Sequence, residues 1–152
     1  MEQLIETSIF TDEVNLHHAS SGQRFANYLI DVITFYAFVF CFFFALASVA
    51  PEFTNSILVY VDNGLVSLLM YGLYMGTIEV IFQGRSLGKL VTGTKAVTED
   101  GVSVDARKAF LRGLIRAVPF NGFSGLGYHC NPWHDRWTKT HVVDIKKSVL
   151  PL

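Results

Sequence analysis

The chain has 152 residues, of which 51% are hydrophobic and 14% aromatic, while only 16% are charged. The formal net charge is -1 and the mean hydropathy is +0.36. This composition is typical of a small integral membrane protein with a modest portion outside the lipid, and we expect no nucleic-acid partner. The two cysteines, Cys41 and Cys130, lie far apart in the chain and exclude a disulfide framework.

The first apolar stretch predicts a membrane-spanning helix at about residues 25–50. Residues 1–23 before it are acidic, and residues 32–51 carry no charge. A run of about 20 apolar residues matches the hydrocarbon thickness of a bilayer. The acidic segment and the length of the run argue against a cleaved signal peptide. Asp31 stands directly before the uncharged run, where a carboxylate is costly, and is therefore the first functional candidate.

A second apolar stretch predicts another spanning helix at about residues 56–82. Asp62 lies near its start and Glu79 near its end. The loop expected around residues 51–55 is so short that the two helices must form an antiparallel transmembrane hairpin over residues 24–82. Glu79 is a second candidate for a functional acid within the membrane region.

The positions of the basic residues predict the orientation. Arg24 stands at the entrance to the first helix, and the other Lys and Arg residues follow the second helix, from Arg85 to Lys147. The loop between the helices carries Glu52 and no base. Because Lys and Arg are retained on the cytoplasmic side, both termini of this multi-pass protein are expected in the cytoplasm.

Residues 83–152 are expected to form a cytoplasmic or interfacial region that starts with a small β-hairpin at about residues 90–104. Alternating β-compatible residues at positions 92–98 favour a first strand. Asp100-Gly101 is a turn signal, and residues 102–104 would return as the partner strand. A strand-like piece at residues 141–145 could add to this hairpin.

An amphipathic basic helix is predicted at about residues 105–118, with Asp105 as its N-cap. We expect it to lie on anionic headgroups with its aliphatic residues facing the lipid. Residues 119–128 are apolar, short and rich in glycine, and would dip into the interface as a re-entrant stretch. The predicted fold class is an all-α integral membrane protein, with a two-helix transmembrane hairpin, a small cytoplasmic β-hairpin and an interfacial amphipathic or re-entrant helical segment.

Several short motifs together resemble the RDD family of small bacterial membrane proteins, named for one arginine and two aspartates. They cover nearly the whole chain and comprise GQRFA at 22–26, LID at 29–31, Glu79, GRSLGK at 84–89, EDG at 99–101, HDRW at 134–137 and THVV at 140–143. The resemblance places the family arginine at Arg24 and its aspartates at Asp31 and Asp135.

The resemblance implies a protein of the bacterial cytoplasmic (inner) membrane whose role is poorly defined. Transport of unidentified ligands has been suggested for the family, and some members are linked to sodium/proton exchange. Many relatives carry a longer apolar third segment, whereas residues 119–128 are too short to cross a bilayer. That departure weakens the transfer of a transport activity to this chain.

The spacing of the candidate residues limits their interactions. Arg24 and Asp31 are separated by about 10 Å of helical rise, so a direct bond between them would be strained. Arg24 is either a snorkelling anchor at the headgroups or the partner of an aspartate, Asp31 or Asp135. Asp31 needs another partner or a proton. In an antiparallel hairpin Asp31 and Glu79 lie at similar depth, where they could share a proton or a cation.

Gly72 and Gly76 form a GxxxG spacing, which allows close helix packing. They lie within about 60° of Glu79 on the helical wheel. A ridge of small residues on the first helix, at positions 37, 41 and 45, could receive the glycines. The same pattern could instead mediate contact between subunits.

No catalytic constellation is recognisable, so we expect no enzyme, no cofactor and no metal. The cluster His129, Cys130, His134, Asp135 and His141 matches no common zinc spacing. Two functions remain. One is an accessory or scaffold subunit of a membrane assembly. The alternative is an oligomeric transporter of small ions or solutes, such as a sodium/proton exchanger. In both cases the partners are the lipid bilayer and either further copies or other subunits.

Overall fold

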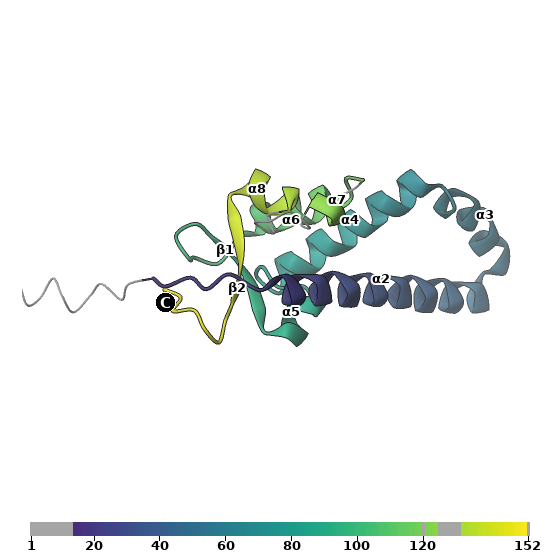
Figure 1. Ribbon diagram of the computed structural model, residues 1–152. Coiled ribbons are helices and arrows are strands. Elements are labelled where there is room, and N and C mark those ends of the chain that lie inside the picture. The colour runs from purple at the N-terminus through teal and green to yellow at the C-terminus, as the bar shows by residue number, and fades with distance from the viewer. Residues whose placement is uncertain (1–13, 120, 125–131, 152) are drawn as a thin grey trace, which may run out of the picture.

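A computed structural model describes residues 14–119, 121–124 and 132–151 of the chain. Three helices, α2 (Ser21–Val49), α3 (Pro51–Val61) and α4 (Gly64–Ile81), form one part that we call the arm. Residues 14–20 and the described residues from 85 onward form a second part, the cap, at the end of the arm where α2 begins (Figure 1). Within the arm, α2 and α4 diverge away from the cap and α3 joins their far ends.

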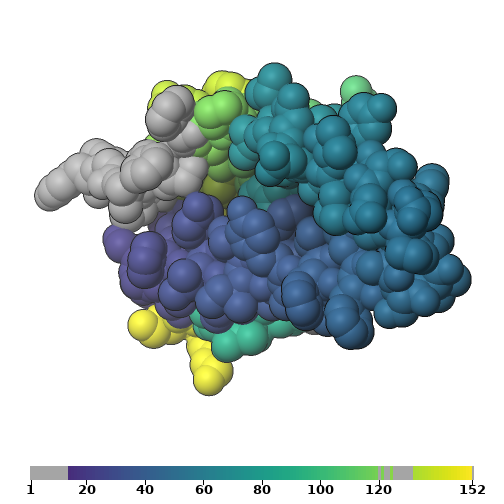
Figure 2. All heavy atoms as spheres, turned by 90° about the vertical axis from the view of Figure 1, so that its right-hand side faces the viewer, coloured from purple at the N-terminus to yellow at the C-terminus, as the bar shows by residue number. Residues whose placement is uncertain are grey.

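The arm contains two helices, α2 and α4, that are long and apolar enough to cross a membrane by length and composition. Ser20 begins α2 with a capping box, in which its side chain accepts from Gln23 N and the Gln23 side chain accepts from Ser20 N. Large apolar side chains of α2, among them Phe40 and Phe44, are exposed, and α2 lies open on the face of the molecule that Figure 2 shows. Apolar side chains directed outward along such a helix suit lipid contact.

The second apolar stretch forms two helices instead of the single helix expected at residues 56–82. Residues 51–55, expected as a loop, are the first turns of α3, which Pro51 opens at a position where its missing N–H costs nothing. The helical conformation ends at Asp62. A new helix begins after Asn63, whose side chain accepts from Leu65 N and caps α4. The break turns α4 back toward the cap, so the antiparallel course is retained.

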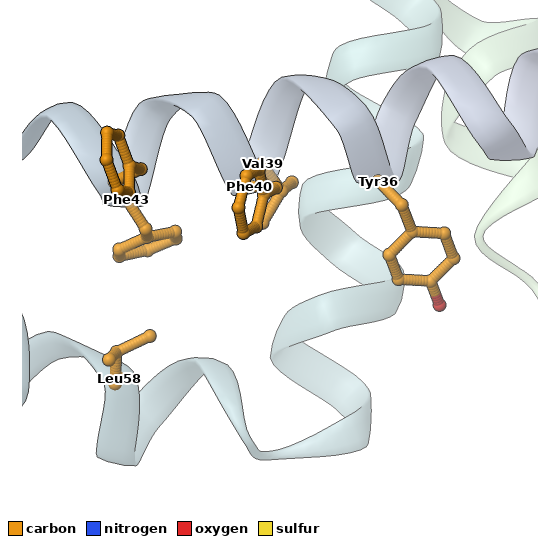
Figure 3. A pocket seen from close by; sticks show the side chains of 6 residues that line it. Tyr36, Val39, Phe40, Phe43 and Leu58 are labelled. Carbon is orange, nitrogen blue, oxygen red and sulfur yellow. The ribbon is translucent and has the colours of Figure 1, made fainter.

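Aromatic side chains join the two long helices near the cap. Phe35 of α2 lies 5.2 Å from the ring of Tyr71 and 5.4 Å from that of Tyr74. Farther along the arm, a groove of about 380 Å³ opens between α2 and α3 (Figure 3). Its lining carries no charge and consists of Tyr36, Val39, Phe40, Phe43, Phe44 and Leu58. The groove is therefore separate in chemistry from the polar end of the arm.

A small antiparallel sheet is present, but its second strand differs from the expected one. β1 (Thr94–Thr98) pairs with β2 (Thr140–Asp144), with Thr94 opposite Asp144 and Thr98 opposite Thr140. Residues 102–104 contribute only an isolated bridge, Val97 to Ser103. Asp105 follows at once as a helix cap, which leaves too few residues for a full partner strand.

The N-terminal segment and two short helices complete the cap around this sheet. Residues 14–20 run beside β2, with bridges from His18 to Val143 and from Asn15 to Val149. The helix α5 (Leu87–Thr92) lies against α2, and α8 (Trp133–Thr138) leads into β2. The bridge from Asn15 to Val149 thus holds the residues before α2 beside the end of the chain.

The basic helix α6 (Ala106–Arg116) is present, and Asp105 caps it by accepting from Lys108 N at 2.7 Å. α6 packs along α4 and buries Arg112 completely and Arg116 except for 9% of its side chain, so these two arginines do not reach headgroups as expected. Of the stretch expected to be re-entrant, the structure shows the short helix α7 (Asn121–Ser124), while residues 120 and 125–128 lie outside the described residues.

Candidate functional site: a buried ion network

Glu79, near the end of α4, is the centre of a network of buried charges. Its Oε1 lies 2.6 Å from Lys89 Nζ and 2.7 Å from Arg116 Nη2, and its Oε2 lies 3.0 Å from Arg112 Nε. The Glu79 and Arg112 side chains are both 0% exposed. Three cations from α5 and α6 thus converge on one carboxylate, which joins the cap to the arm.

Asp31 of α2 binds the same arginine as Glu79. Asp31 Oδ2 lies 3.1 Å from Arg116 Nη1, and Oδ1 accepts from Gly88 N at 2.8 Å. The partner that the sequence required for Asp31 is therefore Arg116 of the cap and not Arg24. The two acids do lie at similar depth and share a cation, which is the Arg116 guanidinium.

The contact between α2 and α5 depends on a residue without a side chain. A Cβ added to Gly88 would lie 2.4 Å from the carbonyl oxygen of Asn27, a distance that real Cβ atoms do not show. Only glycine lets the backbone of α5 approach α2 closely enough for Gly88 N to donate to Asp31. The N-cap of α5 is Ser86, which accepts from Lys89 N and starts the turn that directs the Lys89 side chain inward.

Asp135 of α8 forms the other end of the network. Its Oδ2 lies 2.7 Å from Arg24 Nη1, and its Oδ1 lies 2.8 Å from Arg112 Nη1, at an angle that gives an ion pair and not a hydrogen bond. Arg112 Nη1 also donates to Thr140 Oγ1 of β2. Arg24 therefore has a specific partner, and it further donates to the carbonyl of Val142.

The charges around Asp135 control its ionisation. Burial by itself would raise the pKa of this carboxyl, but the charges of Arg112 and Arg24 outweigh burial and hold the pKa below its usual range. His134 is adjacent, with Nε2 3.5 Å from Asp135 Oδ1, and burial keeps the pKa of its imidazole well below the usual value. Asp135 is therefore an ionised group beside a neutral histidine.

The ion pairs form one continuous network. Arg112 joins Asp135 to Glu79, and Arg116 joins Glu79 to Asp31. The network thus runs from Arg24 to Asp31, which belong to the same helix, through the cap and α4. All four residues singled out from the sequence, Arg24, Asp31, Glu79 and Asp135, are members of it.

Gly72 and Gly76 pack against α6, so the expectation that the small residues of the first helix receive them is wrong. A Cβ on Gly76 would lie 2.9 Å from Phe110, and one on Gly72 would lie 2.8 Å from the Cβ of Ala117. Gly113 of α6 faces the same contact, and a Cβ there would lie 2.0 Å from Gly76 N. The close approach of the two helices is what lets the α6 arginines reach Glu79.

Sequence reasoning missed Lys89, Arg112 and Arg116 as members of the site. Lys89 was noted only as the last residue of the GRSLGK motif, and the helix with the two arginines was assigned to the headgroups. A signal was present, because Ala109, Gly113 and Ala117 recur at helical spacing on the face that carries both arginines. Small residues between two arginines indicate a face that approaches another backbone, where the arginines are buried.

The histidine and cysteine cluster does not form a metal site in the part of the chain that the structure describes, since no group of three metal-binding side chains occurs there. His129 and Cys130 lie outside the described residues. His134 contacts Asn121, and His141 stacks edge-on against His18 with ring centres 5.0 Å apart. The polar chemistry of the described site is therefore that of the ion network.

Comparison with known protein families matches residues 18–142 to the RDD family, which covers most of the chain. The chain belongs to the RDD family. The resemblance seen in the sequence is thereby confirmed, and with it a membrane-associated protein. Neither the curated proteins nor the solved structures contain a match to this RDD protein. In this RDD chain, the arginine and the second aspartate are paired at one end of the network, and the first aspartate stands at the other end.

Proposed function

We propose that this RDD protein is a non-enzymatic accessory or scaffold subunit of an assembly in the bacterial inner membrane. The observation that carries the proposal is that Asp31, Glu79 and Asp135 are each bound by cationic side chains of the same chain. The network fixes the cap to the membrane helices and gives a partner subunit a rigid surface.

The charges of the network argue against cation transport through these acids. A site for Na⁺ needs oxygen ligands that are free to bind the ion, yet the oxygens of Glu79 already bind Lys89, Arg112 and Arg116. A further cation at this place would be repelled by those three side chains. Two helices also enclose no pathway by themselves, so transport would require several copies.

The proposed topology has both termini and the cap in the cytoplasm and α3 at the outer surface. The support is the distribution of charge, since α3 carries Glu52 and no base, whereas the cap carries nearly all Lys and Arg residues. The partners in this proposal are the bilayer and the other subunits of the assembly.

The deciding experiment is to determine the mass and composition of the complex extracted in mild detergent from its native membrane at natural abundance. We expect a stable complex with unrelated subunits. A homo-oligomer without other chains would contradict the proposal and favour transport, because the protein would then have to build its own pathway.

A sodium and proton flux assay on the purified protein in vesicles completes the test. We expect no flux from the wild type above that of empty vesicles. Flux that is lost in Asp31→Asn and retained in Asp62→Asn would contradict the scaffold proposal, because Asp62 is an acid of the arm outside the network.

A further inference from the structure

The buried network contains more cations than anions. Arg24, Lys89, Arg112 and Arg116 face three carboxylates, those of Asp31, Glu79 and Asp135. With His134 neutral, the fully ionised network carries one excess positive charge. A buried charge without a counter-charge raises the free energy of the folded protein. Neutralisation of one group in the network would therefore stabilise the fold.

Hydrogen-bond donors are also in excess. Arg112 Nη2 and Arg116 Nε are buried nitrogens that have no acceptor among the described residues. Other N–H groups of both arginines donate to the carboxylates, and Arg112 also donates to Thr140. One buried acceptor, Asp135 Oδ1, likewise lacks a donor. The unpaired donors still exceed the unpaired acceptors by one, so removal of one proton from Lys89, whose partner Glu79 Oε1 also accepts from Arg116, would leave no further acceptor without a donor.

Lys89 is the member that can release this proton. Guanidinium groups keep their protons in proteins, and each of the three carboxylates is paired with at least one arginine. The Lys89 amine has one carboxylate contact, with Glu79 Oε1, and this oxygen also binds Arg116 Nη2. A neutral Lys89 would leave Glu79 with two arginine partners and the network with no net charge.

We propose that Lys89 is a proton-exchange site, which binds and releases a proton at the junction between the arm and the cap. The site takes a proton as its ligand, and the charged groups that face it come from every element around it. Those groups are Glu79 of α4, Arg112 and Arg116 of α6, Asp31 of α2 and Asp135 of α8. This inference is independent of the scaffold proposal, because it concerns the internal chemistry of the network.

The electrostatic surroundings agree with this assignment. Burial lowers the pKa of Lys89, Glu79 raises it, and Arg116 and Arg112 lower it again, to about 8 in sum. The side chain of Lys89 is 1% exposed, so water does not solvate the excess positive charge at this position. A lysine in this position changes charge at a pH only slightly above that of the cytoplasm.

The experiment is an NMR titration of the full chain in lipid nanodiscs, with ¹³C-labelled lysine, from pH 6 to pH 11. Comparison with Lys89→Met and Lys89→Arg identifies the Lys89 signal, and the second variant serves if the first does not fold. We expect a midpoint near pH 8 for Lys89, below the ordinary lysine value of 10.5. A Lys89 signal that stays protonated through pH 10 would overturn the proposal.

Lys95 is the matched control, because its pKa is also lowered, by burial and then by Arg85, although it lies outside the network. Lys95→Met removes its signal and so prevents a wrong assignment. If the low midpoint persists in Lys89→Arg, it belongs to another lysine and the proposal is wrong. The titration is informative whether or not the protein transports ions or binds other subunits.

Discussion

At the scale of single residues, Glu79 is the side chain whose charge the junction between arm and cap needs most. Glu79→Gln keeps the shape but leaves Lys89, Arg112 and Arg116 without their shared carboxylate. Breaking a buried ion pair by removing one partner costs about 3–5 kcal/mol. We therefore expect Glu79→Gln to lower the free energy of unfolding in detergent by an amount of that order.

Glu52→Gln provides the control for this measurement. Glu52 lies in the first turn of α3, is exposed and has no part in the network. We expect this change to alter unfolding by less than about 0.5 kcal/mol. Equal effects of the two substitutions would show that the convergence of cations on Glu79 contributes little.

The pair Arg24 and Asp135 can be tested by a double-mutant cycle. Nη1 of Arg24 lies 2.7 Å from Oδ2 of Asp135. The changes in unfolding free energy caused by Arg24→Gln and Asp135→Asn should therefore not be additive, and we expect a coupling energy of about 1–3 kcal/mol. Arg24→Gln with Asp62→Asn is the matched cycle, because Asp62 lies at the far end of the arm. A coupling for Arg24 and Asp135 no larger than in this second cycle would mean that Arg24 is mainly an anchor at the headgroups.

Much of the residue-level site could be predicted from the sequence, but its pairing could not. A carboxylate beside an apolar run has to have a partner, which singled out Asp31. The helical rise made a direct bond from Arg24 strained, but it left Arg24 as one of the possible partners. The partner that the structure shows, Arg116, is 85 positions away in the chain. Local spacing contains no information about such a contact, so the arginines of α6 were assigned to lipid headgroups instead.

At the scale of secondary-structure elements, the contact between α4 and α6 depends on glycine. Gly113→Ala would place a Cβ 2.0 Å from Gly76 N and force the helices apart. Overpacking of this kind costs about 1–3 kcal/mol, and displacement of α6 would also lengthen the ion pairs to Glu79. We expect a lowered unfolding temperature in detergent.

Gly64→Ala is the control for this change, because nothing lies within 4 Å of a Cβ added there. It also replaces a glycine by a better helix former within α4. We expect its unfolding temperature to be equal to or slightly above that of the wild type. If Gly113→Ala behaves in the same way, the backbone contact between the two helices is not tight in solution.

The type of a helix or strand could be predicted where its local sequence pattern is strong. The prediction was wrong where a segment distant in the sequence determines the pairing. The apolar runs predicted α2 and α4, and the N-cap signal at Asp105 predicted the start of α6. The break at Asp62 and Asn63 was missed, because a long apolar run outweighs two polar residues in any local count. A strand at residues 141–145 was expected to add to the hairpin, but residues 102–104 were taken as the partner strand because they are nearer in sequence. In the structure β2 pairs with β1 in a full register of five residues.

At the scale of the whole molecule, the network makes the arm and the cap one structural unit. Its cations come from α2, α5 and α6, and its carboxylates from α2, α4 and α8, so neither part satisfies its buried charges alone. A carboxylate left without cations at the end of an apolar hairpin would be costly. The arm should therefore reach its final arrangement only after the cap has been synthesised.

The orientation of this unit in the membrane can be tested by labelling with a maleimide that does not cross lipid. Ser56 of α3 and Ser148 near the end of the chain are both exposed or partly exposed and lie at opposite ends of the molecule. In a background with Cys41 and Cys130 replaced by alanine, we expect Ser56→Cys to react in intact spheroplasts. Ser148→Cys should react only after the membrane is opened, because the basic residues hold the cap in the cytoplasm. The reverse pattern would place the cap outside, and labelling of both positions in intact spheroplasts would mean that the arm does not cross the bilayer.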